Sequence, residues 1–173
     1  MKIVLTALIV ILLTSCSSIN MERYSDNEMQ LDLFSYFSGK TKGWGIVQDR
    51  KGELIRQFVV DIEGEVTEEG KLVLHEQFQW SDGEQSSRTW VLSRQGDHSL
   101  TGTADDVINQ AQGTLYGNVL NWKYQLNLKV DDSTWKITFD DWLFQVSEEL
   151  LLNKATMSKF GFDVGEITIV FQK

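Results

Sequence analysis

Two ionisable side chains of opposite charge fall at positions that a β-strand would point toward the protein interior. Glu76 precedes Phe78 by two residues in an alternating segment, and Arg88 lies in the next such segment. We expect a three-residue loop between them, in which Ser81 pairs with Gln85. Arg88 then comes opposite Phe78 and diagonal to Glu76. A carboxylate and a guanidinium so placed form either a buried structural ion pair, which is the commoner case, or the polar anchor of a ligand cavity.

Asp141 raises the same question in a later segment, where alternation places it inward beside Trp122. Barrels that hold small ligands combine an apolar wall with a few convergent polar groups. Glu76, Arg88 and Asp141 fit the polar part of that description. The aromatic side chains that fit the wall are Trp122, Tyr124, Trp135 and Phe139. A solid core made of these same aromatic residues is almost equally compatible with the pattern.

Other catalytic or metal chemistry has little support. The only histidines are His75, on the face opposite Leu74, and His98, in a turn, and we expect both to be solvated. A zinc site and a Ser-His-Asp triad are therefore not expected. Three acidic pairs lack the alternating spacing of a calcium loop and are better explained as solvated turn and strand-end residues. These pairs are Asp105-Asp106, Asp131-Asp132 and Asp140-Asp141. We expect no catalytic residue, no metal and no cofactor.

The first sixteen residues combine one basic residue, a short apolar run and a cysteine. The run over residues 3–13 follows Lys2 and is too short for a permanent membrane span, which is typical of a signal peptide. Leu13-Thr14-Ser15-Cys16 resembles the bacterial lipobox, and Cys16 is the only cysteine in the chain. We expect residues 1–15 to be removed and Cys16 to carry lipid chains such as palmitate. An ordinary signal peptide with a chance cysteine is the alternative.

Charge and composition limit the partners of the mature protein. Removal of residues 1–15 removes one lysine, which leaves 15 basic and 25 acidic side chains and a formal charge of −10. Such a protein is a poor partner for nucleic acid or an anionic lipid surface. Ser17 follows the cysteine where an aspartate would resemble an inner-membrane retention signal. We therefore expect an outer-membrane anchor with the protein facing the periplasm.

A single all-β domain is expected after a tether. Residues 16–28 are the lipidated cysteine and a polar, flexible tether, and residues 29–173 form the domain. Residues 29–37 predict a short helix or an irregular plug. From Trp44 onward the hydrophobic period is two, with frequent turn signals, which indicates nine or ten antiparallel strands in up-and-down order. So many short strands avoid exposed edges by closing into a barrel, and a flattened sandwich is the alternative.

The clearest hairpin predicts its own register. Gly117-Asn118 is a two-residue turn signal that pairs Tyr116 with Val119 and so places Gly113 opposite Trp122. A turn at Asp131-Asp132 then starts the next strand. Pairing across that turn places Trp135 opposite Leu128 and Asp141 opposite Trp122.

Several short segments resemble a bacterial putative lipoprotein family, domain of unknown function 3833, over residues 37–173. They are Gly43-Trp44-Gly45, Gly102-Thr103-Ala104-Asp105-Asp106, Gly117-Asn118, Asn121-Trp122-Lys123-Tyr124, Asp140-Asp141-Trp142, and Asn153 with Lys159-Phe160-Gly161. Where this chain has Asn109, the family has glycine. The resemblance implies a lipoprotein without an established activity, and gene neighbours for fatty-acid modification. A fainter likeness to lipocalin-type (calycin-like) barrels is carried by Gly43-Trp44 after the short helix, and it is an analogy of fold alone.

Three functions are compatible with the sequence. The first is a module that binds or transfers an apolar or lipid-like ligand in the periplasm. The second, nearly equal, is a structural or protein-interaction lipoprotein with a solid core. The third is an enzyme that acts on modified lipids with Glu76 or Asp141 as acid or base, which would require a strongly perturbed pKa in an open cleft.

Overall fold

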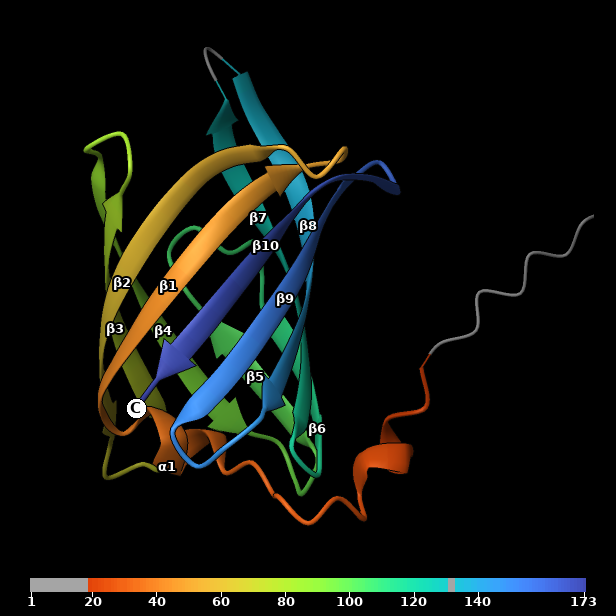
Figure 1. Ribbon diagram of the computed structural model, residues 1–173. Helices are drawn as coiled ribbons and strands as arrows, with labels where there is room; N and C mark the ends of the chain where they lie inside the picture. The colour runs from red at the N-terminus through yellow and green to blue at the C-terminus, as the bar shows by residue number, and fades with distance from the viewer. Residues whose placement is uncertain (1–18, 131–132) are drawn as a thin grey trace, which may run out of the picture.

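The computed structural model describes residues 19–130 and 133–173. The predicted signal peptide, Cys16 and the turn at Asp131-Asp132 lie outside the described residues. The alternation of apolar and polar side chains produces a closed, antiparallel, ten-stranded barrel, as predicted (Figure 1). In chain order the strands are β1 Gly39–Asp49, β2 Leu54–Val66, β3 Leu72–Trp80, β4 Gln85–Arg94, β5 Ser99–Thr103, β6 Ala111–Tyr116, β7 Val119–Val130, β8 Ser133–Gln145, β9 Leu150–Lys159 and β10 Phe162–Gln172.

Every strand pairs with its neighbours in the chain, and β1 closes the barrel by pairing with β10. The seam runs from Lys42 opposite Gln172 to Asp49 opposite Gly165. Gly43 and Gly45 face inward on β1, where a Cβ at Gly45 would lie 2.1 Å from the ring of Phe58. Trp44 between them faces outward and is 44% exposed. The lipocalin-like order of helix, glycine and tryptophan therefore does not bring this tryptophan into the core.

Trp122 organises the wall made by β5, β6 and β7. As predicted, Gly113 pairs with Trp122, and Tyr116 pairs with Val119 across the hairpin. The Trp122 ring packs over two glycines, Gly102 of β5 and Gly113 of β6. A Cβ at these positions would lie 2.6 Å and 2.5 Å from the ring, respectively. On the other side Trp122 pairs with Asp141 of β8. Small residues on two strands thus make room for one large ring.

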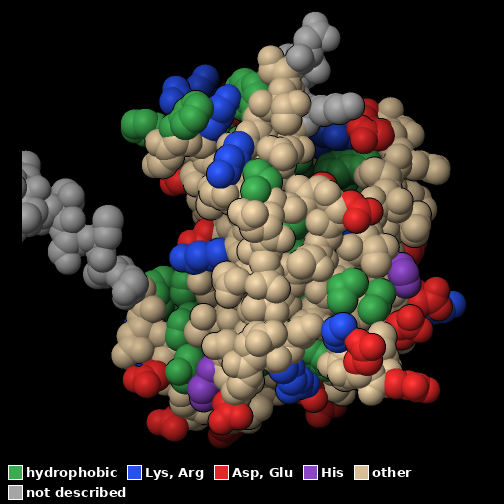
Figure 2. All heavy atoms as spheres, turned by 180° about the vertical axis from the view of Figure 1, so that it is seen from behind, with side chains coloured by type: hydrophobic (Ala, Val, Ile, Leu, Met, Phe, Trp, Pro, Cys, Tyr) green, Lys and Arg blue, Asp and Glu red, His purple; other side chains and the backbone are tan. Residues whose placement is uncertain are grey.

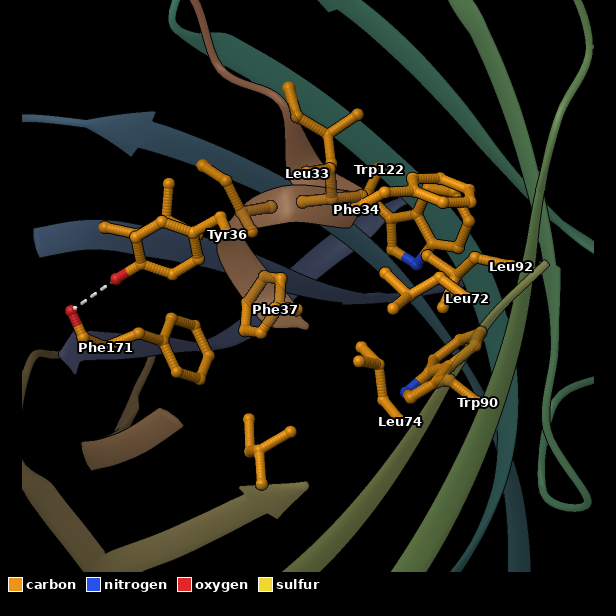
Figure 3. Close-up of a cluster of buried hydrophobic side chains, with 14 of the residues drawn as sticks. Leu33, Phe34, Tyr36, Phe37, Leu72, Leu74, Trp90, Leu92, Trp122 and Phe171 are labelled. Carbon is orange, nitrogen blue, oxygen red and sulfur yellow. Dashed lines mark hydrogen bonds between the residues drawn. The ribbon is translucent and has the colours of Figure 1, made fainter. Parts of the chain in front are cut away.

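One end of the barrel is closed by a short helix. Asp32 caps α1 (Leu33–Phe37) by accepting hydrogen bonds from the backbone N–H groups of Phe34 and Ser35. Four of the five helical residues are buried, and Phe37 meets Phe171 edge to face with ring centroids 5.6 Å apart. Figure 3 shows these side chains against the apolar residues of the strands, which are Leu72, Leu74, Trp90, Leu92, Trp122 and Phe171. The plug predicted over residues 29–37 is present, and its helix begins at Leu33.

Tyr36 ties this plug to the last two strands. Its hydroxyl donates to the carbonyl oxygens of Phe171, at 3.1 Å (Figure 3), and Glu149, at 2.9 Å. Burial raises the pKa of Tyr36 to about 12, so the hydroxyl keeps its proton and remains a donor. Lys173 also reaches the plug, where its Nζ donates to the carbonyl oxygen of Ser38. The chain end and the plug are therefore fixed to one another.

The segment before the plug lies along the same end of the barrel. A 3-10 helix, η1 (Met21–Tyr24), contacts β6, and the side chain of Asn27 donates to Asn118 at 2.6 Å. Gly117 has a φ of 56° and its Cα lies against the backbone of Tyr24, so only glycine fits there. Within the described residues, neither helix has the length and apolar character needed to cross a membrane.

Removal of the plug's central ring should destabilise the barrel strongly. We expect Phe37→Ala to lower the free energy of unfolding by about 3–5 kcal/mol, because Phe37 is 4% exposed and its loss leaves a cavity at the closed end. Ser35→Ala, on the exposed side of the same helix, should change it by less than about 0.5 kcal/mol. Urea denaturation followed by circular dichroism measures both. Equal effects of the two variants would show that α1 does not contribute to the core.

Candidate ligand-binding site

A layer of polar side chains crosses the interior between two apolar clusters. The larger cluster lies against α1, and the smaller one contains Leu126, Ile137 and Phe139. Tyr124 packs against both clusters. We call the inward-facing polar residues between them the polar layer; they are Glu76, Arg88, Asp106, Tyr124, Asp141 and Asn153. Sequence analysis singled out Glu76, Arg88, Tyr124 and Asp141, and the structure brings these four together.

Glu76 and Arg88 face each other directly across β3 and β4. The sequence-based register, with Arg88 opposite Phe78, is therefore wrong. The loop is Ser81-Asp82-Gly83, with the N–H of Trp80 donating to the carbonyl oxygen of Glu84 at 2.9 Å. Gly83 has a φ of 89°, and a three-residue hairpin loop requires such a left-handed residue at its third position. This requirement moves the pairing and places Ser86, not Arg88, opposite Phe78.

Arg88 forms its ion pair with Asp106, not with Glu76. Its Nη2 lies 3.0 Å from Oδ2 of Asp106, in the loop between β5 and β6. That loop is held against β7 by a bridge between Val107 and Leu126, and by the N–H of Ile108, which donates to the carbonyl oxygen of Gln125 at 2.8 Å. Because β5 and β6 are short, this loop covers the part of the barrel wall that they do not reach. Asp106, expected to be solvated, instead has one buried carboxylate oxygen.

Asn109 completes the same loop in a left-handed conformation, with a φ of 62°. Asparagine tolerates this conformation better than most residues with a side chain, and glycine tolerates it without cost. Asparagine at this position, where the family has glycine, therefore forms the same turn.

Asp141 accepts two long hydrogen bonds inside the barrel. The Tyr124 hydroxyl donates to its Oδ2 at 3.3 Å, and Nδ2 of Asn153 donates to the same oxygen at 3.4 Å. Burial raises the pKa of Asp141 from 3.8 to about 7, against the lowering effect of these bonds and of Arg88. Burial and Asp141 also raise the pKa of Tyr124 well above its usual value. Burial therefore favours the protonated form of both groups.

One carboxyl oxygen of Glu76, Oε2, is buried and accepts no hydrogen bond from the described residues. Burial raises the pKa of Glu76 from 4.5 to about 7; Arg88 lowers it, and Asp106 raises it further. Near neutral pH, Glu76 and Asp141 are thus each poised between the charged and the neutral form.

Five atoms of the polar layer are buried without a hydrogen-bond partner among the described residues. They are Oε2 of Glu76, Nε of Arg88, and one Oδ1 each from Asp106, Asp141 and Asn153. An unsatisfied buried polar atom typically costs about 1–3 kcal/mol, so native proteins rarely collect several in one place without a reason. Such a set can accept hydrogen-bond donors from a bound molecule.

The predicted aromatic wall is divided among different environments. Trp122 and Phe139 are buried at 6% and 4% exposure. Tyr124 stacks on Phe139 with centroids 5.0 Å apart, and Trp90 meets both Trp122 and Tyr124 edge to face. Trp135 is 36% exposed at the start of β8 and lies away from the polar layer. Its assignment to a binding site stays a prediction, as do the others.

Two residues of the polar layer escaped sequence analysis. Asp106 sits in a loop that reaches across the chain to Arg88, and no local pattern marks that contact. Asn153 follows Leu151 by two residues on β9, so alternation places it inward. The alternation of apolar residues in this segment could have identified Asn153.

A groove lies on the outside of the barrel. It has a volume of about 570 Å³ and is lined by residues of β1, β2 and β3 and by the end of β10, including Trp44, His75 and Gln77. His98 is also exposed and stacks on Tyr116, with ring centroids 3.9 Å apart. Over residues 19–130 and 133–173, no three His, Cys, Asp or Glu side chains converge closely enough to hold a metal ion.

The two raised carboxyl pKa values should make the protein less stable as the pH rises. The folded state holds protons on Glu76 and Asp141 up to about pH 7, whereas the unfolded chain releases them near pH 4. The free energy of unfolding should therefore fall between about pH 4.5 and 8, by an amount on the order of a few kcal/mol. Thermal unfolding across this range measures the effect.

Two variants separate these carboxyls from the rest of the protein. Asp141→Asn and Glu76→Gln should each flatten the decline with pH, because neither amide ionises. Exposed carboxylates with lowered pKa values, such as Asp49 and Asp82, affect stability only at more acidic pH. A wild-type profile that is flat from pH 4.5 to 8 would contradict the assignment.

Comparisons with known proteins give a family and a fold. A structure of the S-type phycobiliprotein lyase of Guillardia theta is similar over 88% of this chain and 96% of its own, with a TM-score of 0.60 and 7% identity. A protein of unknown function from the DUF3598 family of Nostoc punctiforme is similar over 83% of this chain and 50% of its own, with a TM-score of 0.60 and 14% identity. At such identities these likenesses establish a lipocalin-like barrel and nothing more.

Sequence comparison gives the family. The search of the curated proteins finds no match. The model of the family described as "Protein of unknown function (DUF3833)" matches residues 10–173, and so confirms the resemblance expected from the sequence motifs. The chain belongs to the DUF3833 family.

Proposed function

We propose that this protein binds an amphipathic small molecule in the open half of the barrel, with the polar head of the ligand at the polar layer. The observation that carries the proposal is the group of five buried, unsatisfied polar atoms on side chains that face inward. A ligand that supplies partners to these atoms removes a cost that the empty protein bears. This gives binding a source of affinity beyond apolar contact.

The chemistry of the unsatisfied atoms favours one class of head group. Four of the five are carbonyl or carboxyl oxygens, and only Nε of Arg88 is a donor. Three carboxyl groups face one guanidinium, and that guanidinium is engaged by Asp106. A head group rich in N–H or O–H donors, neutral or cationic, therefore fits better than a carboxylate.

Apolar side chains line part of the interior between the polar layer and the open end. Several of them keep part of their surface accessible, although Leu126, Ile137 and Phe139 in this half are buried. Those that line this half include Val47, Phe78, Leu128, Met157 and Ile167. A hydrocarbon or ring system on the ligand would bury further apolar surface, at about 25 cal/mol per Å². The ligand would therefore have its polar end at the polar layer and its apolar end toward the mouth of the barrel.

The aromatic stacking inside the barrel favours a second candidate function. Tyr124 and Phe139 are nearly parallel, at 4°, and with Trp90 and Trp122 they fill much of the centre. A structural or protein-interaction role, with no ligand inside, accounts for this packing. The two functions differ in what a native mass measurement finds.

We propose further that the protein is an envelope lipoprotein, anchored through Cys16 in the outer membrane and facing the periplasm. The support is the sequence from Lys2 to Cys16, with its short apolar run directly before a lipobox-like site. The anchor and the ligand site are independent proposals.

The bound molecule should be detectable in protein isolated from its host's envelope in mild detergent. We expect native mass spectrometry of the mature protein to show a stoichiometric adduct that organic extraction releases. Asp141→Asn should lower its occupancy about tenfold or more, because a hydrogen bond to a charged group is lost. Gln77→Ala, which changes an exposed side chain on β3, is the matched control.

Added long-chain probes test the head-group chemistry. Dodecylamine should bind more tightly than dodecanoate, with quenching of tryptophan fluorescence as the readout, since Trp90 and Trp122 lie beside Tyr124. A bare protein mass together with no response to either probe would overturn the proposal and favour the solid-core function.

Lipidation is tested separately. Cells labelled with radioactive palmitate should label the protein, and Cys16→Ser should abolish both the label and its recovery in the membrane fraction. Ser17→Ala leaves the lipobox cysteine in place and serves as the control. Retention of the label in Cys16→Ser would contradict the anchor.

A further inference from the structure

Large apolar side chains are exposed around the open end of the barrel. Phe160, in the turn between β9 and β10, is 90% exposed, and Phe162, the first residue of β10, is 75% exposed. Leu54 and Ile55, at the start of β2, are 55% and 58% exposed. Together with Trp135 they make up what we call the mouth rim. Isolated exposed apolar residues are ordinary, but a group at one opening needs an explanation.

Strand pairing places these residues in one arc. β10 pairs with β1 up to Asp49, so the β9–β10 turn stands beside the β1–β2 turn that precedes Leu54 (Figure 1). β9 pairs with β8 as far as Thr138, which brings Lys159 next to Trp135. The arc thus covers the ends of four strands, β1, β8, β9 and β10, and the start of β2.

Phe160 holds its exposed position in a strained backbone conformation. Its φ is 52°, and Gly161 follows with a φ of 82°. A left-handed conformation is costly for a bulky residue; asparagine would form the same turn at a lower cost, and glycine without it. The barrel itself gains nothing from a ring that is 90% exposed. Strain of this kind, retained without benefit to the fold, points to a function outside it.

Basic residues accompany the apolar ones. Nζ of Lys159 lies 2.9 Å from the ring centre of Trp135 and 5.5 Å from that of Phe160. Lysines with aromatic neighbours suit the boundary between hydrocarbon and water, since the stem is apolar and the ammonium group stays hydrated. The turns and strand ends at the rim also carry further basic side chains, Arg50, Lys51 and Lys136, and the acidic side chains Asp49, Glu53 and Asp163.

The two ends of the barrel differ in charge. Figure 2 shows hydrophobic side chains beside Lys and Arg at the upper left, over the open end, whereas acidic side chains are most numerous at the lower end. Loops at the closed end carry Glu68, Glu69, Asp97, Glu148 and Glu149. The protein's negative charge would keep that end away from anionic lipid, while the mixed charge of the rim does not oppose contact.

We propose that the mouth rim docks onto a phospholipid bilayer, with Phe160 and Phe162 inserted at the boundary between headgroups and acyl chains. Single aromatic residues on narrow, protruding turns suit a deformable lipid surface. A protein partner would require a contiguous, closely packed patch of roughly 800 Å². Docking would place the barrel opening at the bilayer. The proposal goes beyond ligand binding and depends on neither the ligand nor the anchor.

The experiment uses the mature sequence from Ser17 onward, so that neither the apolar run over residues 3–13 nor an acyl anchor contributes to binding. Flotation with vesicles of phosphatidylethanolamine and phosphatidylglycerol, in a three-to-one ratio, should recover the protein with the lipid. Phe160→Ser with Phe162→Ser should lower the bound fraction at least tenfold, because both apolar insertions are lost. Val66→Ser with Val146→Ser, exposed apolar residues near the closed end, should leave it unchanged.

A further variant separates docking from folding. Phe160→Asn should reduce vesicle binding and yet keep or raise the melting temperature, since asparagine accepts the left-handed conformation. Failure of the wild-type rim to float with vesicles, or equal flotation of the double phenylalanine variant, would overturn the proposal. Concentration-dependent dimers that the double variant loses, without vesicle binding, would show that the rim is a protein interface instead.

Discussion

Helix α1 packs into one end of a closed sheet, and Tyr36 bonds that helix to the carbonyl oxygens of Glu149 and Phe171. A barrel of ten strands encloses more space than its own side chains fill unless something enters from outside. Here Leu33, Phe34 and Phe37 enter from one end only. The larger apolar cluster is built around this packing, and the polar layer lies beyond it.

The polar layer lies where the packed end gives way to the open one. On the side of α1 the apolar side chains are mostly buried, whereas on the other side several inward-facing residues keep accessible surface, although Leu126, Ile137 and Phe139 are buried there. Three carboxyl groups and one guanidinium at this level are costly in the empty protein, because burial opposes charge and the hydrogen-bond partners are incomplete. Removing Asp106 from the set would leave Arg88 without its ion pair. The loop between β5 and β6 therefore supports the layer as much as the strands do.

The local alternation of apolar and polar residues was enough to predict most of the fold. Alternation over β7 and β8 was enough to place Trp122 opposite Gly113 and Asp141, since a register error of one residue would have turned every apolar side chain outward. The predicted register failed at the β3–β4 loop, where Gly83 adopts the left-handed conformation. The position of this glycine could have been used to predict the correct loop from the sequence. The pairing of Arg88 with Asp106 was not available, because it joins segments through space. Trp135 has the inward parity of Phe139, but parity says nothing of how far a strand extends beyond the core.

The seam between β1 and β10 also has a kinetic meaning. It joins Lys42 to Gln172, so β1, which pairs with β2 on one edge, cannot find the partner of its other edge until β10 is available. Contacts of such sequence separation slow folding, because loop-closure entropy is lost before the contacts compensate for it. Until then β1 is an unpaired edge next to a growing meander, and it is open to intermolecular pairing. A nascent copy of this chain therefore depends on staying unaggregated until Phe171 of β10 reaches Tyr36 and Phe37.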